Sequence, residues 1–152
     1  MTTEQYIKQL YESRLIRTDK EFETFEKTLE ILADIATEDD IPLLCTVFDD
    51  NTEEHEVMYG LIHFIEYYRG EKATKLILKN IPAMLLGAKD WAKIFIYRML
   101  NSEPHREIMK NVLGELDETE RLMFINVLLE IRNQEPEVFE KKIDEVLGKD
   151  DV

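Results

Sequence analysis

The chain contains 152 residues, with 19 Lys or Arg, 33 Asp or Glu and a formal net charge of −14 at pH 7. This acidity argues against binding nucleic acid through its phosphates, because phosphate binding requires a basic surface. The one cysteine excludes an intramolecular disulfide framework, and no uncharged apolar run is long enough to span a membrane.

Apolar residues recur at three- and four-residue spacing along nearly the whole chain, which is typical of amphipathic helices. We expect nine helices, over residues 3–16, 19–36, 41–48, 53–68, 71–86, 89–100, 102–116, 118–132 and 136–147. Pro82 lies inside the fifth helix and is expected to bend it. No segment alternates polar and apolar residues as a strand does. The sequence therefore predicts a single all-α domain over residues 1–152, and the lack of an apolar signal core at the N-terminus indicates a cytoplasmic protein.

The helices are expected to pair. Residues 53–86, 88–116 and 117–147 each follow the order helix, short turn, helix, and apolar positions recur between them at offsets of 31 to 34 residues. Such a period in helical sequence indicates stacked antiparallel helical hairpins. We therefore expect a HEAT-like short α-solenoid of about eight or nine helices. Any antiparallel helical array gives similar spacings, and this alternative remains open.

The excess negative charge is concentrated in one part of the chain. Residues 28–68 contain eleven acids and no Lys or Arg, whereas residues 1–27 and 69–152 have net charges of −1 and −2. A solvated face that aids solubility would have this composition. A docking surface for a basic partner would have it too, and the partner would relieve the repulsion between the acids.

Residues that could support catalysis are sparse. Cys45 lies in an apolar run and is expected to be a buried, inert thiol. His55 and Glu56 begin a zinc-helix pattern that lacks its second His, and His63 and Glu66 are spaced to share a metal or a hydrogen bond. No glycine-rich phosphate loop or nucleophile elbow is present. We expect no enzymatic activity, metal or cofactor, with a metal-dependent enzyme using these His and Glu residues as the alternative.

Aromatic residues gather in two of the expected helices. Tyr59, Tyr67 and Tyr68 fall in the fourth helix, and Trp91 and Tyr97 fall in the sixth. Most of these rings lie at helical spacing and are expected in the core. Adjacent helical residues point about 100° apart, so Tyr67 and Tyr68 are not both expected to face inward. One of them should be exposed on the acidic helix, where Tyr is a favoured anchor of protein interfaces.

Two segments resemble the motifs of a known family. The sequences FDDNTEEHEVMYGLIHFIE, over residues 48–66, and AKDWAKIFIYRMLNS, over residues 88–102, are similar to the two motifs of the immunity protein 30 family. Tyr59 stands where many relatives have Trp. The resemblance covers roughly residues 20–147. It implies a bacterial all-α protein of a polymorphic toxin system, which neutralises a cognate toxin and has no enzymatic activity.

These observations together predict an immunity protein that binds a cognate toxin domain through an acidic surface. Nucleases, which bind phosphate, are one class of basic toxin that such a surface would suit. A HEAT-like scaffold or adaptor with a non-toxin partner is the alternative. The residues expected to bind the partner or to support the binding surface are Asp49, Asp50, Glu53, Glu54, Glu56, Tyr59, His63, Glu66, Tyr67, Trp91, Tyr97 and Arg98.

Overall fold

The computed structural model describes residues 1–148, and within this range the chain forms nine α-helices, one short 3-10 helix and no strand. The all-α prediction is therefore confirmed. The helices are α1 (Thr3–Glu12), α2 (Asp19–Ile35), α3 (Ile41–Cys45), α4 (His55–Glu66), α5 (Glu71–Met84), α6 (Lys89–Leu100), α7 (Glu103–Glu115), α8 (Glu118–Gln134) and α9 (Pro136–Leu147). The 3-10 helix η1 (Glu38–Asp40) precedes α3 and was not predicted from the sequence.

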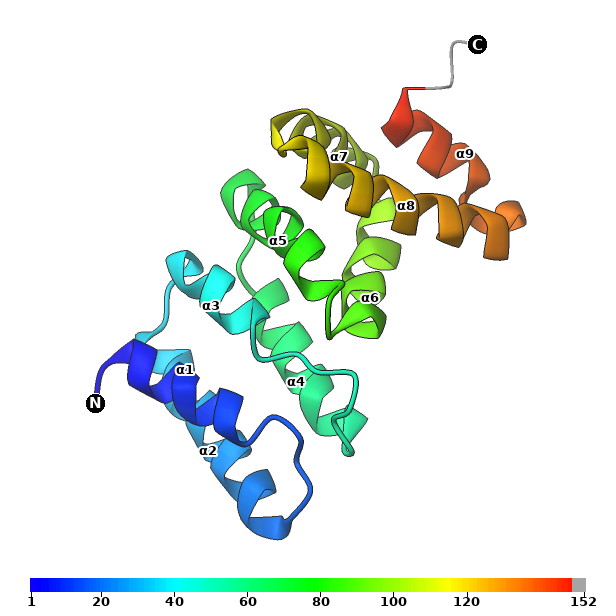
Figure 1. Cartoon of the computed structure of the whole chain (residues 1–152). Coiled ribbons are helices and arrows are strands. Elements are labelled where there is room, and N and C mark those ends of the chain that lie inside the picture. The colour runs from blue at the N-terminus through cyan, green and yellow to red at the C-terminus, as the bar shows by residue number, and fades with distance from the viewer. Residues whose placement is uncertain (149–152) are drawn as a thin grey trace.

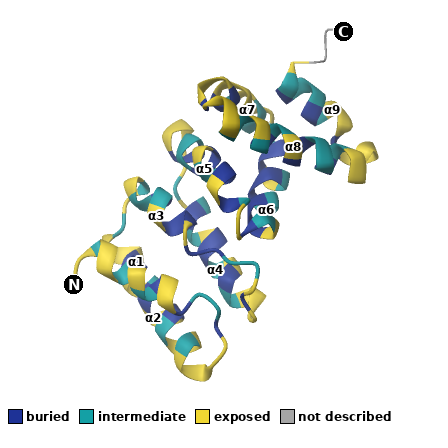
Figure 2. Ribbon diagram, viewed as in Figure 1, coloured by how far each residue is buried: buried dark blue, intermediate teal, exposed yellow. Residues whose placement is uncertain are grey.

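The helices follow one another along one axis, with α1 and α9 at opposite ends (Figure 1). The odd-numbered helices from α1 to α9 contact one another in succession, and α2 contacts α4. Side chains join α4 to α6 and α6 to α8. The buried apolar side chains form one cluster that extends from α1 to α9. They are most abundant in the central helices α5 and α6 (Figure 2).

Side-chain caps explain where several helices begin. The Thr2 and Thr18 hydroxyls accept from the backbone N–H groups of the third helical residues of α1 and α2, and the Asp117 carboxylate does the same for α8. These caps satisfy N–H groups that have no partner within the helix. At the other end of the chain, Gly148 takes a left-handed conformation with φ of 76° and ends α9.

The first helix is shorter than predicted. It ends at Glu12, where the sequence pattern indicated residue 16. The Ser13 hydroxyl donates to the carbonyls of Gln9 and Leu10, which closes the last turn. The chain then turns sharply, and Ile16 takes a positive φ of 47° that places its side chain in the core. Apolar spacing alone did not reveal the turn, because Ile16 is buried whether or not the helix continues.

The segment between α3 and α4 is also less helical than predicted. α3 ends at Cys45, and α4 begins at His55. Val47 and Phe48 leave the helix but remain buried. The intervening loop carries the acids Asp49 and Asp50 to the start of α6, as described below. Its irregular backbone is therefore what brings the two motif segments together.

Candidate functional site

Trp91 is the centre of the site. Its side chain is only 3% exposed and lies among three aromatic side chains from the other motif segment. Its ring centroid is 5.8 Å from that of Phe48, 5.7 Å from His55 and 5.2 Å from Tyr59. The His55 and Tyr59 rings meet it edge to face, which is a favoured geometry for aromatic pairs. Two segments that are separate in the sequence thus form one packed unit.

The Trp91 indole also fixes the acidic loop. Its Nε1–H donates to the backbone carbonyl of Asp49 over 3.0 Å. Phe48, one residue earlier, packs edge to face against Phe95, which is on the next turn of α6. A buried indole N–H requires an acceptor, and this carbonyl supplies one. The indole therefore holds the backbone of the loop as well as its aromatic side chains.

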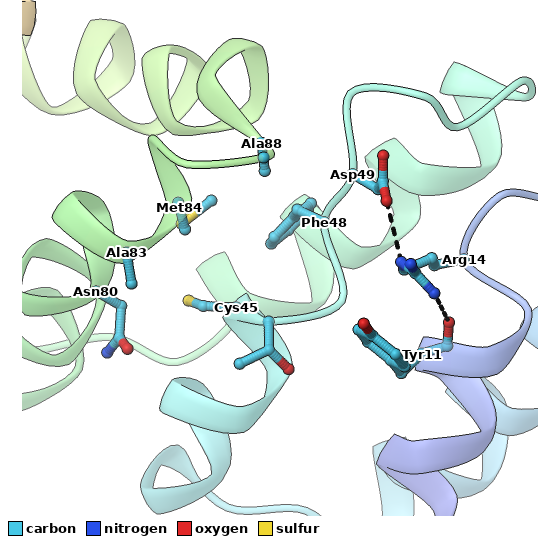
Figure 3. A pocket seen from close by; sticks show the side chains of 11 residues that line it. Tyr11, Arg14, Cys45, Phe48, Asp49, Asn80, Ala83, Met84 and Ala88 are labelled. Atoms are coloured by element: carbon cyan, nitrogen blue, oxygen red, sulfur yellow. Dashed lines mark hydrogen bonds and ion pairs between the residues drawn. The ribbon is translucent and has the colours of Figure 1, made fainter.

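The Asp49 side chain serves the fold. Its Oδ2 accepts from Arg14 Nε over 3.1 Å, and its Oδ1 accepts from the backbone N–H of Asn51 over 2.8 Å. Arg14 also donates to the Tyr11 carbonyl and lies 4.0 Å from the centroid of the Tyr11 ring. Figure 3 shows Arg14 between Tyr11 and Asp49, beside a cavity of about 330 Å³. One negative charge of the acidic stretch is thereby neutralised within the chain.

Asp50 caps a helix that is distant in sequence. Its Oδ1 accepts from the backbone N–H of Asp90 over 3.1 Å, in the first turn of α6. Its own N–H donates to the Gly87 carbonyl over 3.1 Å. Ala88, the cap residue of α6, has no side-chain acceptor, so Asp50 performs this function from the loop. Partial burial raises the pKa of Asp50, and the hydrogen bond from the Asp90 N–H opposes that rise.

The loop is fastened to the opposite side of the molecule as well. The Thr52 hydroxyl donates to the Arg14 carbonyl over 2.7 Å, and the Glu53 N–H donates to the Leu15 carbonyl over 2.9 Å. Thr52 is buried. The loop thus connects the turn after α1 with the start of α6, and the backbone before α4 is held from both sides.

The residues around the start of α4 and the outer face of this helix point to solvent. Glu53, Glu54 and Glu56 are exposed, and none forms an ion pair within the described part of the chain. Tyr59, His63 and Tyr67 continue the exposed face at four-residue spacing, and Tyr67 is 82% exposed. These six residues are termed the α4 face below. The prediction that one of the adjacent tyrosines is exposed is confirmed, since Tyr68 is half-buried.

Six of the predicted site residues lie outside the α4 face: Asp49 and Asp50 in the preceding loop, described above, and Glu66, Trp91, Tyr97 and Arg98. Glu66 forms an ion pair with Arg98 over 2.7 Å, which links the ends of α4 and α6. Tyr97 instead stacks on Phe139 of α9, with centroids 5.3 Å apart. Burial raises the pKa of Tyr97, and nearby carboxylates raise it further. Trp91, as described, is a core residue.

Pairing divides the eleven acids of residues 28–68 into two groups. Bases from outside this stretch form ion pairs with Glu38, Asp39, Asp49 and Glu66. Asp40 and Asp50 accept hydrogen bonds from backbone N–H groups. The remaining acids are exposed and form no ion pair among residues 1–148; they are Glu30, Asp34, Glu53, Glu54 and Glu56. The uncompensated charge therefore lies on α2 and at the start of α4.

The residues considered for catalysis lie beside aromatic rings or in the core. His55 packs against Trp91, and His63 lies 6.4 Å from the Tyr59 ring. Among residues 1–148, no three His, Cys, Asp or Glu side chains gather as a group that could hold a metal ion. Cys45 is buried, and burial raises the pKa of its thiol to about 12.

Sequence reasoning missed two residues of this site. The apolar pattern places Phe48 at the end of a helix over residues 41–48, but α3 ends at Cys45, and Phe48 packs from the following loop against Trp91. Arg14 lies outside both motifs, and a single basic residue at the end of a helix gives no sign of a distant partner. Neither contact follows from local spacing, since both depend on how the loop folds back.

The fold and this site define an all-α protein in which two motif segments, residues 48–66 and 88–102, pack around one tryptophan. Residues 12–109 match the family model of Immunity protein 30, and the chain belongs to this family. The matched range contains both motif segments and Arg14. Comparisons with curated proteins and with solved structures gave no match.

Membership of the family implies an immunity protein that acts against a toxin, binds that cognate toxin and inhibits without enzymatic activity. Within the described residues, no helix is both long enough and apolar enough to cross a membrane. The match over residues 12–109 confirms the family resemblance that the two motif segments indicated.

Proposed function

We propose that this protein binds and neutralises a basic toxin domain through the α4 face, in the cytoplasm of the bacterial cell that makes it. Glu53, Glu54 and Glu56 supply uncompensated negative charge, and Tyr59, His63 and Tyr67 supply contact area beside it. A nuclease is one class of toxin with a suitable basic surface. The observation that carries the proposal is that three exposed acids, which form no ion pair within residues 1–148, lie together beside exposed tyrosines at the start of one helix.

The remaining predicted residues support this face from behind. Asp49, Asp50 and Trp91 hold the loop that precedes α4, while Glu66 and Arg98 join the far end of α4 to α6. A binding face that is ordered before the partner arrives loses less conformational entropy on association. Tyr97 belongs to the support at the α9 side rather than to the contact surface.

We also propose that the helices form a HEAT-like stack of hairpins. The succession of contacts along the odd-numbered helices supports this arrangement. In such a stack the even-numbered helices α2 and α4 form a neighbouring pair on one side, which would extend the binding face beyond one helix.

The proposal is tested by titrating the protein with the toxin domain encoded beside its gene, at low and high salt. Reversing three charges in the variant E53K/E54K/E56K should weaken binding about tenfold or more at low salt, mainly through slower association. The variant should also reduce the dependence of affinity on salt, because fewer charges then steer the encounter.

The matched control is the variant E103K/E118K/E137K. These three acids are likewise exposed and lie in the first turns of α7, α8 and α9, and the variant changes the net charge equally. It should leave affinity nearly unchanged. Equal effects of the two variants would show that only net charge matters and that the α4 face is not the contact surface. If the wild-type protein does not bind the toxin, a scaffold with another partner becomes the better interpretation.

A further inference from the structure

An apolar groove lies between α2 and α4, next to the α4 face. Its volume is about 650 Å³, and it is lined by the second half of α2 and the second half of α4. Leu29, Ala33 and Ala36 contribute from α2 and its end, while Gly60, Phe64 and Tyr67 contribute from α4 and its end. None of these α2 residues was among the predicted site residues.

Small residues create the groove. Ala33 is exposed, Ala36 is half-buried, and Gly60 has no side chain at all. A Cβ at Gly60 would stand 3.7 Å from Leu29 Cδ1, so the two helices are already in contact beneath the groove. Larger side chains at these positions would fill the space. The hollow is therefore a consequence of residue size and not of a gap between the helices.

An aromatic side chain stands at the edge of this groove with little of its surface covered. Tyr67 is 82% exposed, and its ring contacts the Tyr68 ring at a centroid separation of 6.3 Å. Exposed tyrosine beside an apolar hollow is a typical anchor of protein interfaces, because the ring covers a large area and loses little conformational entropy. The hollow would receive a side chain, and the ring would close over it.

The charge around the groove selects the partner. Both walls come from residues 28–68, the stretch without Lys or Arg. Glu30 lines the groove and Asp34 lies one helical turn further on the same face of α2. Neither forms an ion pair within residues 1–148. An occupant with basic residues on either side of an apolar side chain would match this arrangement, whereas an acidic or neutral one would leave the carboxylates without partners.

We infer that the groove receives one bulky apolar side chain of the cognate toxin, with flanking Lys or Arg residues paired to Glu30 and Asp34. This inference rests on the proposed function and extends the contact surface from α4 to α2. The apolar contact supplies the part of the affinity that salt does not screen, and the acids of α2 supply the part that it does. Most of the surface that lines the groove is apolar, which favours a protein side chain over a small polar ligand.

The inference is tested by filling the groove with a larger side chain and measuring the affinity for the toxin domain. The variant A33F should occupy the hollow and weaken binding of the toxin domain about tenfold or more, by the scale of anchor residues. The loss should be the same at low and high salt, in contrast to the loss in E53K/E54K/E56K. The matched control is A83F, because Ala83 is also exposed and helical but lies on α5 beside the cavity of Figure 3. A83F should bind as the wild type does.

Three results decide the matter. If the wild type and A33F bind equally well, the groove is not occupied, while the proposed function stands. If the wild type does not bind, both ideas are overturned. If A33F unfolds, E30K/D34K replaces it, because both side chains are exposed on α2 and neither belongs to the α4 face. A loss of about tenfold supports the groove, and wild-type affinity overturns it.

Discussion

Two neighbouring parts of the acidic stretch use their carboxylates in opposite ways. In the loop before α4, Asp49 pairs with Arg14, and Asp50 caps α6. A few residues later, Glu53, Glu54 and Glu56 point to solvent without ion pairs among the described residues. The local charge density is similar in both parts. What differs is whether the chain supplies a base or a backbone N–H to each carboxylate.

This difference separates stability from binding. Carboxylates with partners inside the chain hold the loop, so replacing them should change the free energy of unfolding. Carboxylates without partners contribute repulsion to the folded state, and a basic partner would relieve that repulsion. A reversal of all five charges together would therefore mix the two effects, and the parts must be changed separately.

The largest expected effect is at the residue that joins the two motif segments. W91A should reduce the free energy of unfolding by about 3–5 kcal/mol, the range for a large aromatic residue truncated in a core. The substitution removes the contacts of the indole with three aromatic side chains and its hydrogen bond to the Asp49 carbonyl. Chemical denaturation measures the loss. The control L86A, at a residue 81% exposed, should change stability by less than about 0.5 kcal/mol.

The next effect concerns the ion pair within the loop. D49A should reduce the free energy of unfolding by about 1–2 kcal/mol, because the side chains of Asp49 and Arg14 are only 17% and 25% exposed and the Asn51 N–H also loses its acceptor. A double-mutant cycle with R14A isolates the coupling between the pair. The pair of Glu66 with Arg98, which is 48% exposed, should show weaker coupling, below about 1 kcal/mol. Equal coupling in the two pairs would contradict a special role for the loop.

Sequence reasoning reached the helices more easily than the loop. The repeated apolar spacing predicted the number and order of the helices, because each helix buries a stripe of apolar residues at three- and four-residue spacing. The charge distribution identified residues 28–68 as unusual. Neither pattern separated Asp49 and Asp50 from Glu53 and Glu54, because their partners, Arg14 and the Asp90 N–H, are distant in sequence.

The groove was missed for a related reason. Ala33 and Gly60 are unremarkable in a sequence, since small residues in helices often only permit close packing. What sets them apart is that both line one groove between α2 and α4, together with Tyr67. Helix geometry predicted that one of two adjacent tyrosines would be exposed, but it did not predict what would lie next to that tyrosine. Contacts between helices determine that, and local periodicity carries little information about them.

The third expected effect is at the helix cap. D50A should reduce the free energy of unfolding by about 1 kcal/mol, the usual value for a lost cap, whereas D50N should stay within about 0.5 kcal/mol at pH 7 because its amide oxygen still accepts from the Asp90 N–H.

The same position gives a pH test. Partial burial raises the folded-state pKa of Asp50 above its unfolded value, so the proton is bound more tightly in the folded state. Its contribution to stability is then fully present below the unfolded pKa and is lost as the pH rises through the folded pKa. The wild type should therefore gain stability relative to D50N as the pH is lowered from neutral into the range where Asp50 becomes protonated. If the wild type instead loses stability relative to D50N as the pH is lowered, the hydrogen bond to the Asp50 carboxylate outweighs the effect of its burial.

The smallest expected effect completes the contrast. The variant E53Q/E54Q/E56Q removes three adjacent charges that have no ion-pair partner in the described residues. Relief of repulsion should raise the free energy of unfolding, while the lost interaction of Glu56 with the N-terminus of α4 should lower it. The net change should lie within about 0.5 kcal/mol and shrink at high salt, as measured by denaturation at two salt concentrations. A loss above about 1 kcal/mol would assign these acids to the fold, together with Asp49. If the variant keeps the free energy of unfolding of the wild type but binds the toxin more weakly, the three acids belong to the interface. A change that leaves the free chain equally stable can act only through the complex.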